Sequence, residues 1–251
     1  MLCEVVLTVA ESKRLIAKGV AAMPAVRNAL ADGIIAVPSG STNAYVVEEL
    51  TGTPIEKNKF MTGATLPAGV SREGLLSREL PDLVLKKGER VENVAAVDAV
   101  KEMGPGDVFV KGANAVHYET RRAGILSGHP TGGTVGASIG ALIARRVTLV
   151  VPVGLEKCVA QPIERAAAFI ASDAECARPV PSLWPVEGEI VTEIEALRFL
   201  TGAEAMQSAA GGLAGAEGAV RLVVRGAREQ IAKVVELADA VHGEPPFVRN
   251  T

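Results

Sequence analysis

The sequence predicts an α/β protein with a mainly parallel sheet, helices on both faces of it, and a small C-terminal α+β module. Apolar residues make up 48% of the 251 residues, whereas aromatic residues make up only 3%. A core of aliphatic side chains suits parallel strands that are covered on both faces. Short apolar runs also alternate with helical patterns along the chain, which favours parallel strands joined by right-handed crossovers.

The N-terminal part contains a strand between helical segments. The opening run MLCEVVLTVA is a strand or the lead-in to the first helix. Residues 12–32 place apolar side chains at helical spacing. Pro24 either divides this stretch into two short helices or kinks one helix. Gly33 is expected to end the helical stretch, and the apolar run IIAVP follows as a buried strand.

A helix follows this strand, with Ser41 or Thr42 as its cap and Gly52 as its end. The runs KFMTGATLPAG and DLVLKKGERV then indicate extended segments. A β-α-β unit is expected from LVLKKG, a helix through 94–103, and the strand VFVKG. Further on, a glycine-rich loop leads into a helix of small residues, and TLVVPVG forms another buried strand.

A change in composition marks the end of the larger domain. The run RPVPSLWPV contains three prolines and the single Trp of the chain, which is typical of a linker or a domain edge. We therefore expect one domain over residues 1–180 and a small α+β module over residues 181–251. In this module Thr192 and Glu195 form a capping box, two strand-like runs follow, and a helix over 229–241 comes last.

Several classes of protein are not supported by composition. The formal net charge is −3 and basic residues form no cluster, so no nucleic-acid partner is expected. The three cysteines show no metal-ligand spacing, so no metal site is expected, and their odd number favours reduced thiols. No cofactor is expected either. The apolar runs are too short to cross a membrane, and the N-terminus is a poor signal peptide. These features indicate a cytoplasmic protein.

Four polar or glycine-rich segments stand where ligands bind in open parallel sheets, beyond the carboxyl ends of strands. One follows IIAVP, one follows DVFV, one precedes the small-residue helix, and one follows TLVVPVG. The candidate ligand-binding residues are Ser39, Gly40, Ser41, Thr42, Lys111, Gly112, Asn114, His129, Thr131, Gly132, Gly133, Thr134 and Lys157.

The chemistry of these segments favours an anion. Free backbone N–H groups at a helix N-terminus, supplemented by hydroxyl groups, attract negative charge. Lys111 can pair with a phosphate or a carboxylate. The alternatives are that Ser41 and Thr42 only cap a helix, that Lys111 is solvated, and that His129 serves as a hydrogen-bonding residue rather than a catalyst. No GxxxxGK[ST] motif is present, so ATP hydrolysis of the Walker type is not indicated.

Two runs resemble a known superfamily. DGIIAVPSGSTNAYVVEELTG is similar to the strand, Gly-Ser-Thr loop and helix at the start of ribose-5-phosphate isomerases and their relatives, which include CoA transferases and DeoR-type effector domains. GDVFVKGANAVHYETRRAGILSGHPTGGTVGASIGALIARRVTLVVPVGLEK resembles the core of the methylthioribose-1-phosphate isomerase and initiation-factor regulatory-subunit branch. The resemblance spans residues 12–157 and implies a Rossmann-like sheet with an anionic ligand held by 39–42, 111–114 and 132–134.

The chain departs from this superfamily where the isomerases carry their acidic residues. Asn114 stands where both isomerase branches have an acid for proton transfer, and Lys111 stands where the pentose-phosphate enzymes have another. An amide cannot act as a general base at neutral pH. Glu119 and Glu156 lie near loops where a CoA transferase would place its nucleophilic glutamate, but neither matches a motif.

Two functions are therefore carried forward. The first is a divergent isomerase-like or CoA-transferase-like enzyme that acts on an anionic small molecule, such as a sugar phosphate, a nucleotide or an acyl-CoA. The second is a non-catalytic sensor or regulatory subunit that retains the anion site. The identity of the ligand and assembly into a homo-oligomer are left open.

Overall fold

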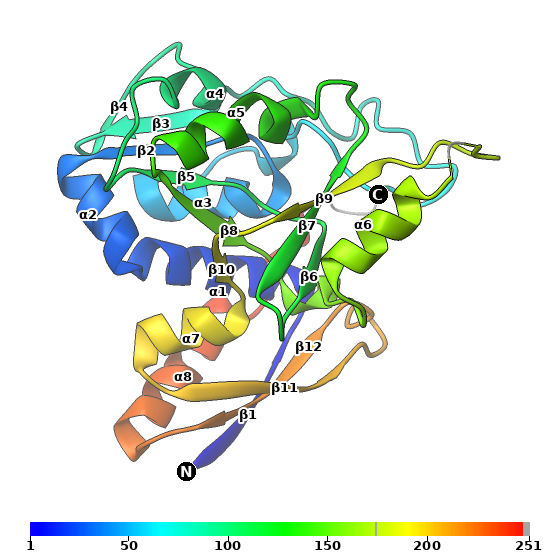
Figure 1. The fold of residues 1–251 in the computed structure, drawn as a ribbon. Coiled ribbons are helices and arrows are strands. Elements are labelled where there is room, and N and C mark those ends of the chain that lie inside the picture. Colours follow the sequence, from blue (N-terminus) through cyan, green and yellow to red (C-terminus); the bar gives the residue numbers. More distant parts are fainter. Residues whose placement is uncertain (174, 248–251) are drawn as a thin grey trace.

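The computed structural model describes residues 1–173 and 175–247 and confirms the α/β, Rossmann-like fold (Figure 1). A six-stranded sheet has the order β10-β8-β5-β2-β3-β4. Neighbouring strands among its first four are parallel, as expected for the runs IIAVP, DVFV and TLVVP. The strands of this sheet are β2 (Ile34–Val37), β3 (Leu83–Lys86), β4 (Glu89–Arg90), β5 (Val108–Val110), β8 (Thr148–Pro152) and β10 (Glu189–Val191).

The predicted β-α-β unit is wrong. β3 pairs antiparallel with β2, and β2 separates β3 from β5 in the sheet. The expected helix over 94–103 contains only α4 (Ala96–Ala99). The run KFMTGATLPAG does not form a strand but contributes the isolated bridge between Phe60 and Arg78. Apolar periodicity could not reveal the strand direction, because an irregular connection brings β3 into the sheet from the opposite end.

Helices cover both faces of the sheet, and the side chains of β2 show how the two faces are divided. Ile35 and Val37 pack toward α1, α2 and α3, whereas Ile34 and Ala36 pack toward α4 and α5. This alternation follows from the period of two along a strand. The bounds of these helices, besides α4, are α1 (Val9–Ala22), α2 (Pro24–Asp32), α3 (Ser41–Thr51) and α5 (Gly133–Ala144).

Local sequence signals explain most of the helix ends. Thr8 and Glu11 form a capping box at the start of α1, earlier than the predicted start. Pro24 opens α2 as a separate helix, and Gly52 closes α3 in the left-handed conformation. The expected cap of α3 is wrong, because Gly40 occupies the N-cap position and no side chain accepts a hydrogen bond there.

A second, antiparallel sheet has the order β6-β7-β9. Its strands are β6 (Ala115–His117), β7 (Arg122–Ser127) and β9 (Ser182–Val186), and α6 (Ile163–Ala171) packs against it. The run RPVPSLWPV, predicted as a linker, supplies β9. Pro185 is tolerated because β9 is an edge strand, paired only with β7.

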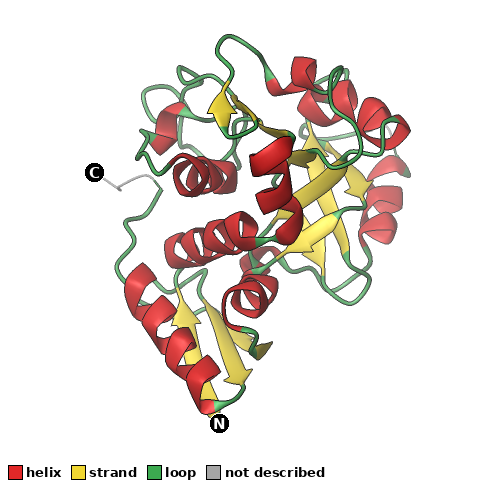
Figure 2. Cartoon of the chain, turned by 90° about the vertical axis from the view of Figure 1, so that its left-hand side faces the viewer, coloured by secondary structure: helices red, strands yellow, loops and turns green. Residues whose placement is uncertain are grey.

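The smaller module is a three-stranded antiparallel sheet, β1-β12-β11, with α7 and α8 packed on it. Its elements are β1 (Leu2–Leu7), α7 (Glu193–Thr201), β11 (Glu204–Ala210), β12 (Val220–Arg225) and α8 (Arg228–Val241). The capping box of Thr192 and Glu195 is confirmed. β1 comes from the N-terminus, so both ends of the chain build the module, which Figure 2 shows below the larger part. Residues 181–191, which follow the expected boundary, supply β9 and β10 to the other two sheets.

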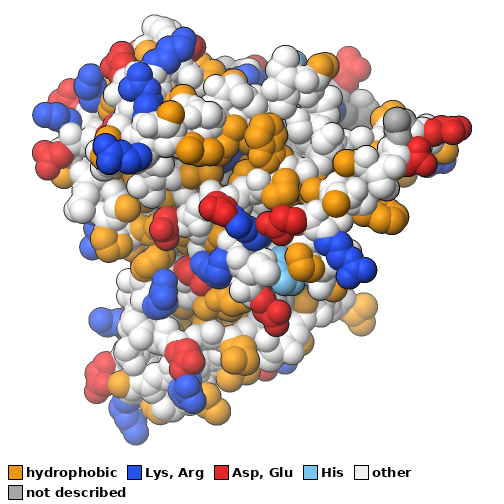
Figure 3. Space-filling view, in the orientation of Figure 1, with side chains coloured by type: hydrophobic (Ala, Val, Ile, Leu, Met, Phe, Trp, Pro, Cys, Tyr) orange, Lys and Arg blue, Asp and Glu red, His pale blue; other side chains and the backbone are white. Residues whose placement is uncertain are grey.

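Among the described residues, no helix is both long enough and apolar enough to cross a membrane. On the face drawn in Figure 3, basic and acidic side chains are interspersed and leave apolar patches between them.

Helix α1 joins the two parts, since it contacts α3 and β8 of the larger part as well as α7 of the module (Figure 1). Gly19 makes the approach to α7 possible, because a Cβ at this position would lie 2.5 Å from Ala196. We predict that Gly19→Ala lowers the free energy of unfolding by about 1–3 kcal/mol, since the two helices must move apart. Urea denaturation measures this change.

Gly140→Ala is the matched control. Gly140 also lies within a helix, but nothing lies within 4 Å of the position that its Cβ would occupy. This substitution is expected to raise the free energy of unfolding by roughly 0.5–1 kcal/mol, because alanine loses less backbone entropy than glycine. Equal effects at the two positions would contradict the close packing of α1 on α7.

Candidate functional site

A cavity of about 750 Å³ lies at the carboxyl ends of β2, β5 and β8. The loops that follow these three strands line it, together with the N-terminal ends of α1 and α5 and the segment 61–66. Every residue proposed from the sequence except Thr131 borders the cavity, namely Ser39, Gly40, Ser41, Thr42, Lys111, Gly112, Asn114, His129, Gly132, Gly133, Thr134 and Lys157.

The loop after β2 is held by hydrogen bonds that leave the start of α3 open. The backbone N–H of Ser39 donates to Asp82 Oδ1 at 3.0 Å, and the Ser39 hydroxyl is hydrogen-bonded to Thr62. The N–H of Gly40 donates to the carbonyl oxygen of Phe60 at 3.0 Å. Since no side chain caps α3, the N–H groups of residues 41–43 are available to a ligand.

The loop before α5 repeats this arrangement. Gly132 and Gly133 both have positive φ, which turns the chain sharply into the helix, and no side chain caps α5. Thr131 is exposed and donates its N–H to His129 Nδ1 at 3.3 Å. The Thr131 hydroxyl also lies within hydrogen-bond distance of His129 Nδ1, at 2.9 Å. Thr131 thus orients His129 and does not border the cavity.

Lys111 and Asn114 both border the cavity, but their side chains are engaged differently. The Lys111 backbone N–H extends the β5–β8 ladder by donating to Val150 O at 2.9 Å, and its Nζ donates to Gly112 O at 3.3 Å. Asn114 accepts the Leu126 N–H on Oδ1 at 3.0 Å. The amide oxygen of Asn114 is thus occupied, whereas its NH₂ group can donate to a ligand.

Glu156 and Lys157 reach the cavity from the short 3₁₀ turn that follows β8, η2 (Leu155–Lys157). Lys157 Nζ donates to Ala113 O at 3.0 Å and lies 4.0 Å from Glu156 Oε1. Glu156 Oε2 is buried and has no hydrogen-bond partner among the described residues. Gly154 makes room for this carboxylate, because a Cβ there would lie 1.8 Å from Oε2.

Lys13 also borders the cavity, although the sequence did not lead us to predict it as a ligand-binding residue. It lies on α1, and its Nζ stands 5.5 Å from the centre of the Phe247 ring. The sequence contains a pattern that could have identified Lys13. It precedes the buried residues Ile16 and Val20 by three and seven positions, so it lies on the same face of the helix. A lysine on the buried, apolar face of a helix places its ammonium group toward the interior of the protein.

Lys13, Lys111 and Lys157 make the cavity electropositive, and the burial of their ammonium groups near one another is energetically unfavourable. Burial, with the neighbouring Lys157 charge added, lowers the pKa of Lys111 to about 8. Burial and Lys157 likewise lower the pKa of Lys13 to about 8, although the Glu156 charge opposes this effect. Among the described residues, the lining contains three lysines and one glutamate, so in ionised form it carries a net charge of two positive units when His129 is neutral.

Asn43 is the second residue missed in the sequence. It is 1% exposed and borders the cavity, and its Nδ2 donates to Pro38 O at 2.8 Å and Val110 O at 3.3 Å. These bonds tie the end of β2 to the end of β5. Asn43 Oδ1 has no partner among the described residues, so a buried acceptor stands ready for a ligand donor.

Glu193 does not border the cavity but holds one of the turns that line it. It is fully buried at the start of α7, and its carboxylate accepts the Leu155 N–H, with Oε2 at 3.0 Å, which fixes the turn that carries Glu156 and Lys157. Burial, followed by the nearby Glu156 charge, raises the pKa of Glu193 to about 7.

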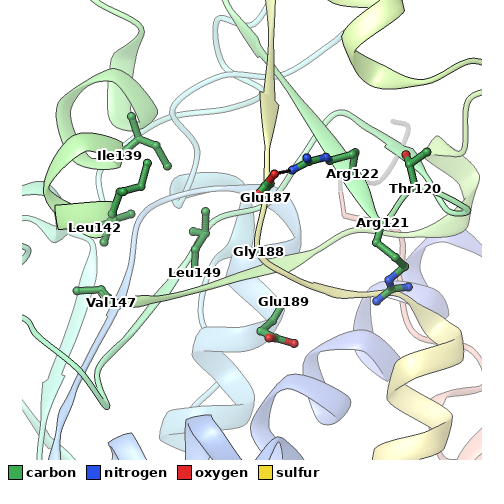
Figure 4. A pocket seen from close by; sticks show the side chains of 11 residues that line it. Thr120, Arg121, Arg122, Ile139, Leu142, Val147, Leu149, Glu187, Gly188 and Glu189 are labelled. Carbon is green, nitrogen blue, oxygen red and sulfur yellow. Dashed lines mark ion pairs between the residues drawn. The ribbon is translucent and has the colours of Figure 1, made fainter. Parts of the chain in front are cut away.

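A second hollow of about 570 Å³ lies beside β10 and has a different character. Figure 4 shows apolar side chains of α5 and β8 on one side of it and the ion pair of Arg122 and Glu187 on the other. Arg121, which also lines this hollow, is paired with Glu195, so its basic side chains are matched by carboxylates. Within the described part of the chain, no three His, Cys, Asp or Glu side chains gather as metal ligands.

Comparisons of the chain with protein-family models, curated proteins and solved structures give no match.

The two glutamates of α7 allow the electrostatics below the site to be tested. The pKa of Glu193 is raised in the fold, so its protonated carboxyl favours the folded state. This contribution to stability is fully present below pH 4.5, the ordinary pKa of a glutamate, and is lost as the pH rises through about 7. We predict that Glu193→Gln raises the free energy of unfolding at pH 8 by on the order of 1 kcal/mol and has less effect at pH 5.

Glu195→Gln should act in the opposite direction. Burial alone would raise the pKa of Glu195, but hydrogen bonds from Thr192 and the charge of Arg121 hold it below its usual range. Its stability contribution is therefore present above pH 4.5 and lost as the pH falls through the lowered pKa. Urea denaturation at pH 8 should show a loss of roughly 1–3 kcal/mol. Losses of similar size for both variants would contradict this assignment of the two carboxylates.

Proposed function

We propose that the chain binds a small phosphorylated or carboxylated molecule in the cavity at the strand ends. One observation carries this proposal: Lys13, Lys111 and Lys157, from three different segments, border one cavity whose lining, among the described residues, contains a single carboxylate. Partial burial of lysines without matching carboxylates is unfavourable in the free protein. A bound anion would offset that cost and would also explain why the three lysines converge.

The starts of α3 and α5 support the same ligand. Both helices direct uncapped N–H groups toward the cavity, and both are of ordinary length, so the positive ends of two helix dipoles meet there. The hydroxyl groups of Ser41, Thr42 and Thr134 add donors. The volume of about 750 Å³ suits a sugar phosphate, a nucleotide or the end of an acyl-CoA.

The superfamily resemblance extends this proposal to a divergent enzyme of the isomerase or CoA-transferase type. Asn114 cannot supply the base of an isomerase. Glu156 borders the cavity, and one of its carboxylate oxygens has no partner among residues 1–173 and 175–247, so it is the residue that we assign to proton transfer or nucleophilic attack. A non-catalytic sensor is the second candidate, and it is favoured by Asn114, whose oxygen is occupied by the backbone of β7.

Replacement of Lys111 should separate binding from stability. We predict that Lys111→Met weakens the binding of inorganic phosphate by roughly 1–3 kcal/mol, because a charge-assisted contact is lost. The same variant should raise the free energy of unfolding at pH 7, because the cost of burying an ammonium group is removed. Calorimetric titration and urea denaturation measure the two effects.

Lys101→Met is the matched control, since the Lys101 side chain is 76% exposed and away from the cavity. It should leave phosphate binding unchanged. If Lys111→Met lowered stability and left phosphate binding intact, Lys111 would be a structural residue and the proposal would lose its main support.

The pH dependence of binding provides a second test. Because the pKa values of Lys13 and Lys111 are about 8, their charges are present at pH 7 and are lost as the pH rises through 8. Sulfate keeps its charge over this range, so we predict that its affinity falls by roughly tenfold or more between pH 7 and pH 9.5. The double variant Lys13→Arg/Lys111→Arg should abolish this fall, because arginine stays protonated. An affinity that does not change with pH in the unmodified chain would exclude these two lysines from the site.

A further inference from the structure

The three lysines of the cavity are not equivalent. Lys157 Nζ donates to Ala113 O and lies 4.0 Å from Glu156 Oε1, so it has both a hydrogen-bond acceptor and an ion-pair partner. Lys13 has no ion pair among the described residues and its pKa is also lowered to about 8, but its Nζ lies 5.5 Å from the centre of the Phe247 ring, and the Glu156 charge opposes the effect of burial. Within the described residues Lys111 has no ion pair, and its Nζ has a single acceptor, the carbonyl oxygen of Gly112 at 3.3 Å.

The surroundings of Lys111 therefore stabilise its ammonium form less than water does. Its backbone is fixed in the ladder between β5 and β8, so the side chain starts from a rigid strand end. Burial and Lys157 lower the pKa of Lys111 to about 8. At neutral pH the neutral amine of Lys111 is therefore more populated than that of an ordinary lysine.

A neutral amine beside other cations is the arrangement that activates lysine as a nucleophile toward carbonyl carbon. Lys13 and Lys157 can hold the anionic group of a ligand while Lys111 attacks. Asn43 Oδ1 and Glu156 Oε2 are buried acceptors that have no partner in the described part of the chain, and they can accept hydrogen bonds from hydroxyl or N–H groups of the same ligand.

We propose that Lys111 forms an imine with the carbonyl carbon of an anionic aldehyde or ketone held in this cavity. The Lys111 nitrogen forms a bond to the carbonyl carbon, and the C=O bond breaks. The carbonyl oxygen leaves as water with both hydrogens of the amine, and a C=N bond is formed. The step is reversible and needs no oxidant or reductant. This inference rests on the proposed anion site and narrows its ligand to carbonyl compounds.

Trapping with sodium borohydride tests the proposal in the full chain. Glyceraldehyde 3-phosphate is added at pH 7.5, borohydride reduces any imine to a stable secondary amine, and peptide mass spectrometry locates the modified lysine. We expect at least tenfold more adduct on Lys111 than on the exposed Lys101. Lys111→Arg should abolish the cavity adduct, and an excess of inorganic phosphate should suppress it.

The outcomes separate the two proposals. If phosphate binds by calorimetry but the adducts are no more abundant on Lys111 than on Lys101, the imine is overturned and the anion site stands. Preferential modification of Lys13 would also overturn the assignment to Lys111. If Lys111 is modified equally well by unphosphorylated glyceraldehyde, the anion site is contradicted and both proposals fall.

Discussion

The convergence of three lysines on one partly buried cavity is the constraint on which the rest of the site depends. Lys13 and Lys111 lose hydration on folding and lie within reach of the Lys157 charge, so each contributes unfavourably to stability at neutral pH. The fold tolerates this cost because rigid elements hold the lysines in place. Asn43 ties two strand ends together, and Glu193 fixes the turn that carries Lys157. A bound anion would convert this cost into affinity.

The larger part and the small module both depend on α1. This helix packs against α3 and β8 on one side and α7 on the other, and Gly19 sets the distance to α7. Arg14 of α1 also forms ion pairs with Glu48, Glu49 and Glu244, which joins α3 to the segment that follows α8. That segment places Phe247 beside Lys13 at the cavity. Both ends of the chain therefore contribute to the geometry of the candidate site.

The sequence was informative where a local signal had one physical meaning. The parallel core of β2, β5 and β8 was predictable from aliphatic runs, and the converging loops followed from the topology of a parallel sheet. The capping box of Thr192 and Glu195 and the helix stop at Gly52 were predictable for the same reason. The direction of β3 was not, because it depends on how the long irregular segment before it is routed.

The remaining errors arose where tertiary structure outweighed local preference. A proline-rich run reads as a linker, yet it forms β9 because it lies at the edge of a sheet. Lys13 and Asn43 were missed because each comes from a helix that needed to be placed in space before its polar group could be assigned to the cavity. The sequence left Lys111 open between a solvated residue and a ligand contact, and its lowered pKa could be found only from its surroundings in the fold.

A crystal structure of the full chain with inorganic phosphate tests the central claim most directly. The account predicts phosphate within hydrogen-bond distance of Nζ of at least two of Lys13, Lys111 and Lys157, and of the N–H groups that open α3 or α5. Phosphate bound elsewhere on the surface, with only water in the cavity, would contradict the claim that these lysines converge to hold an anion.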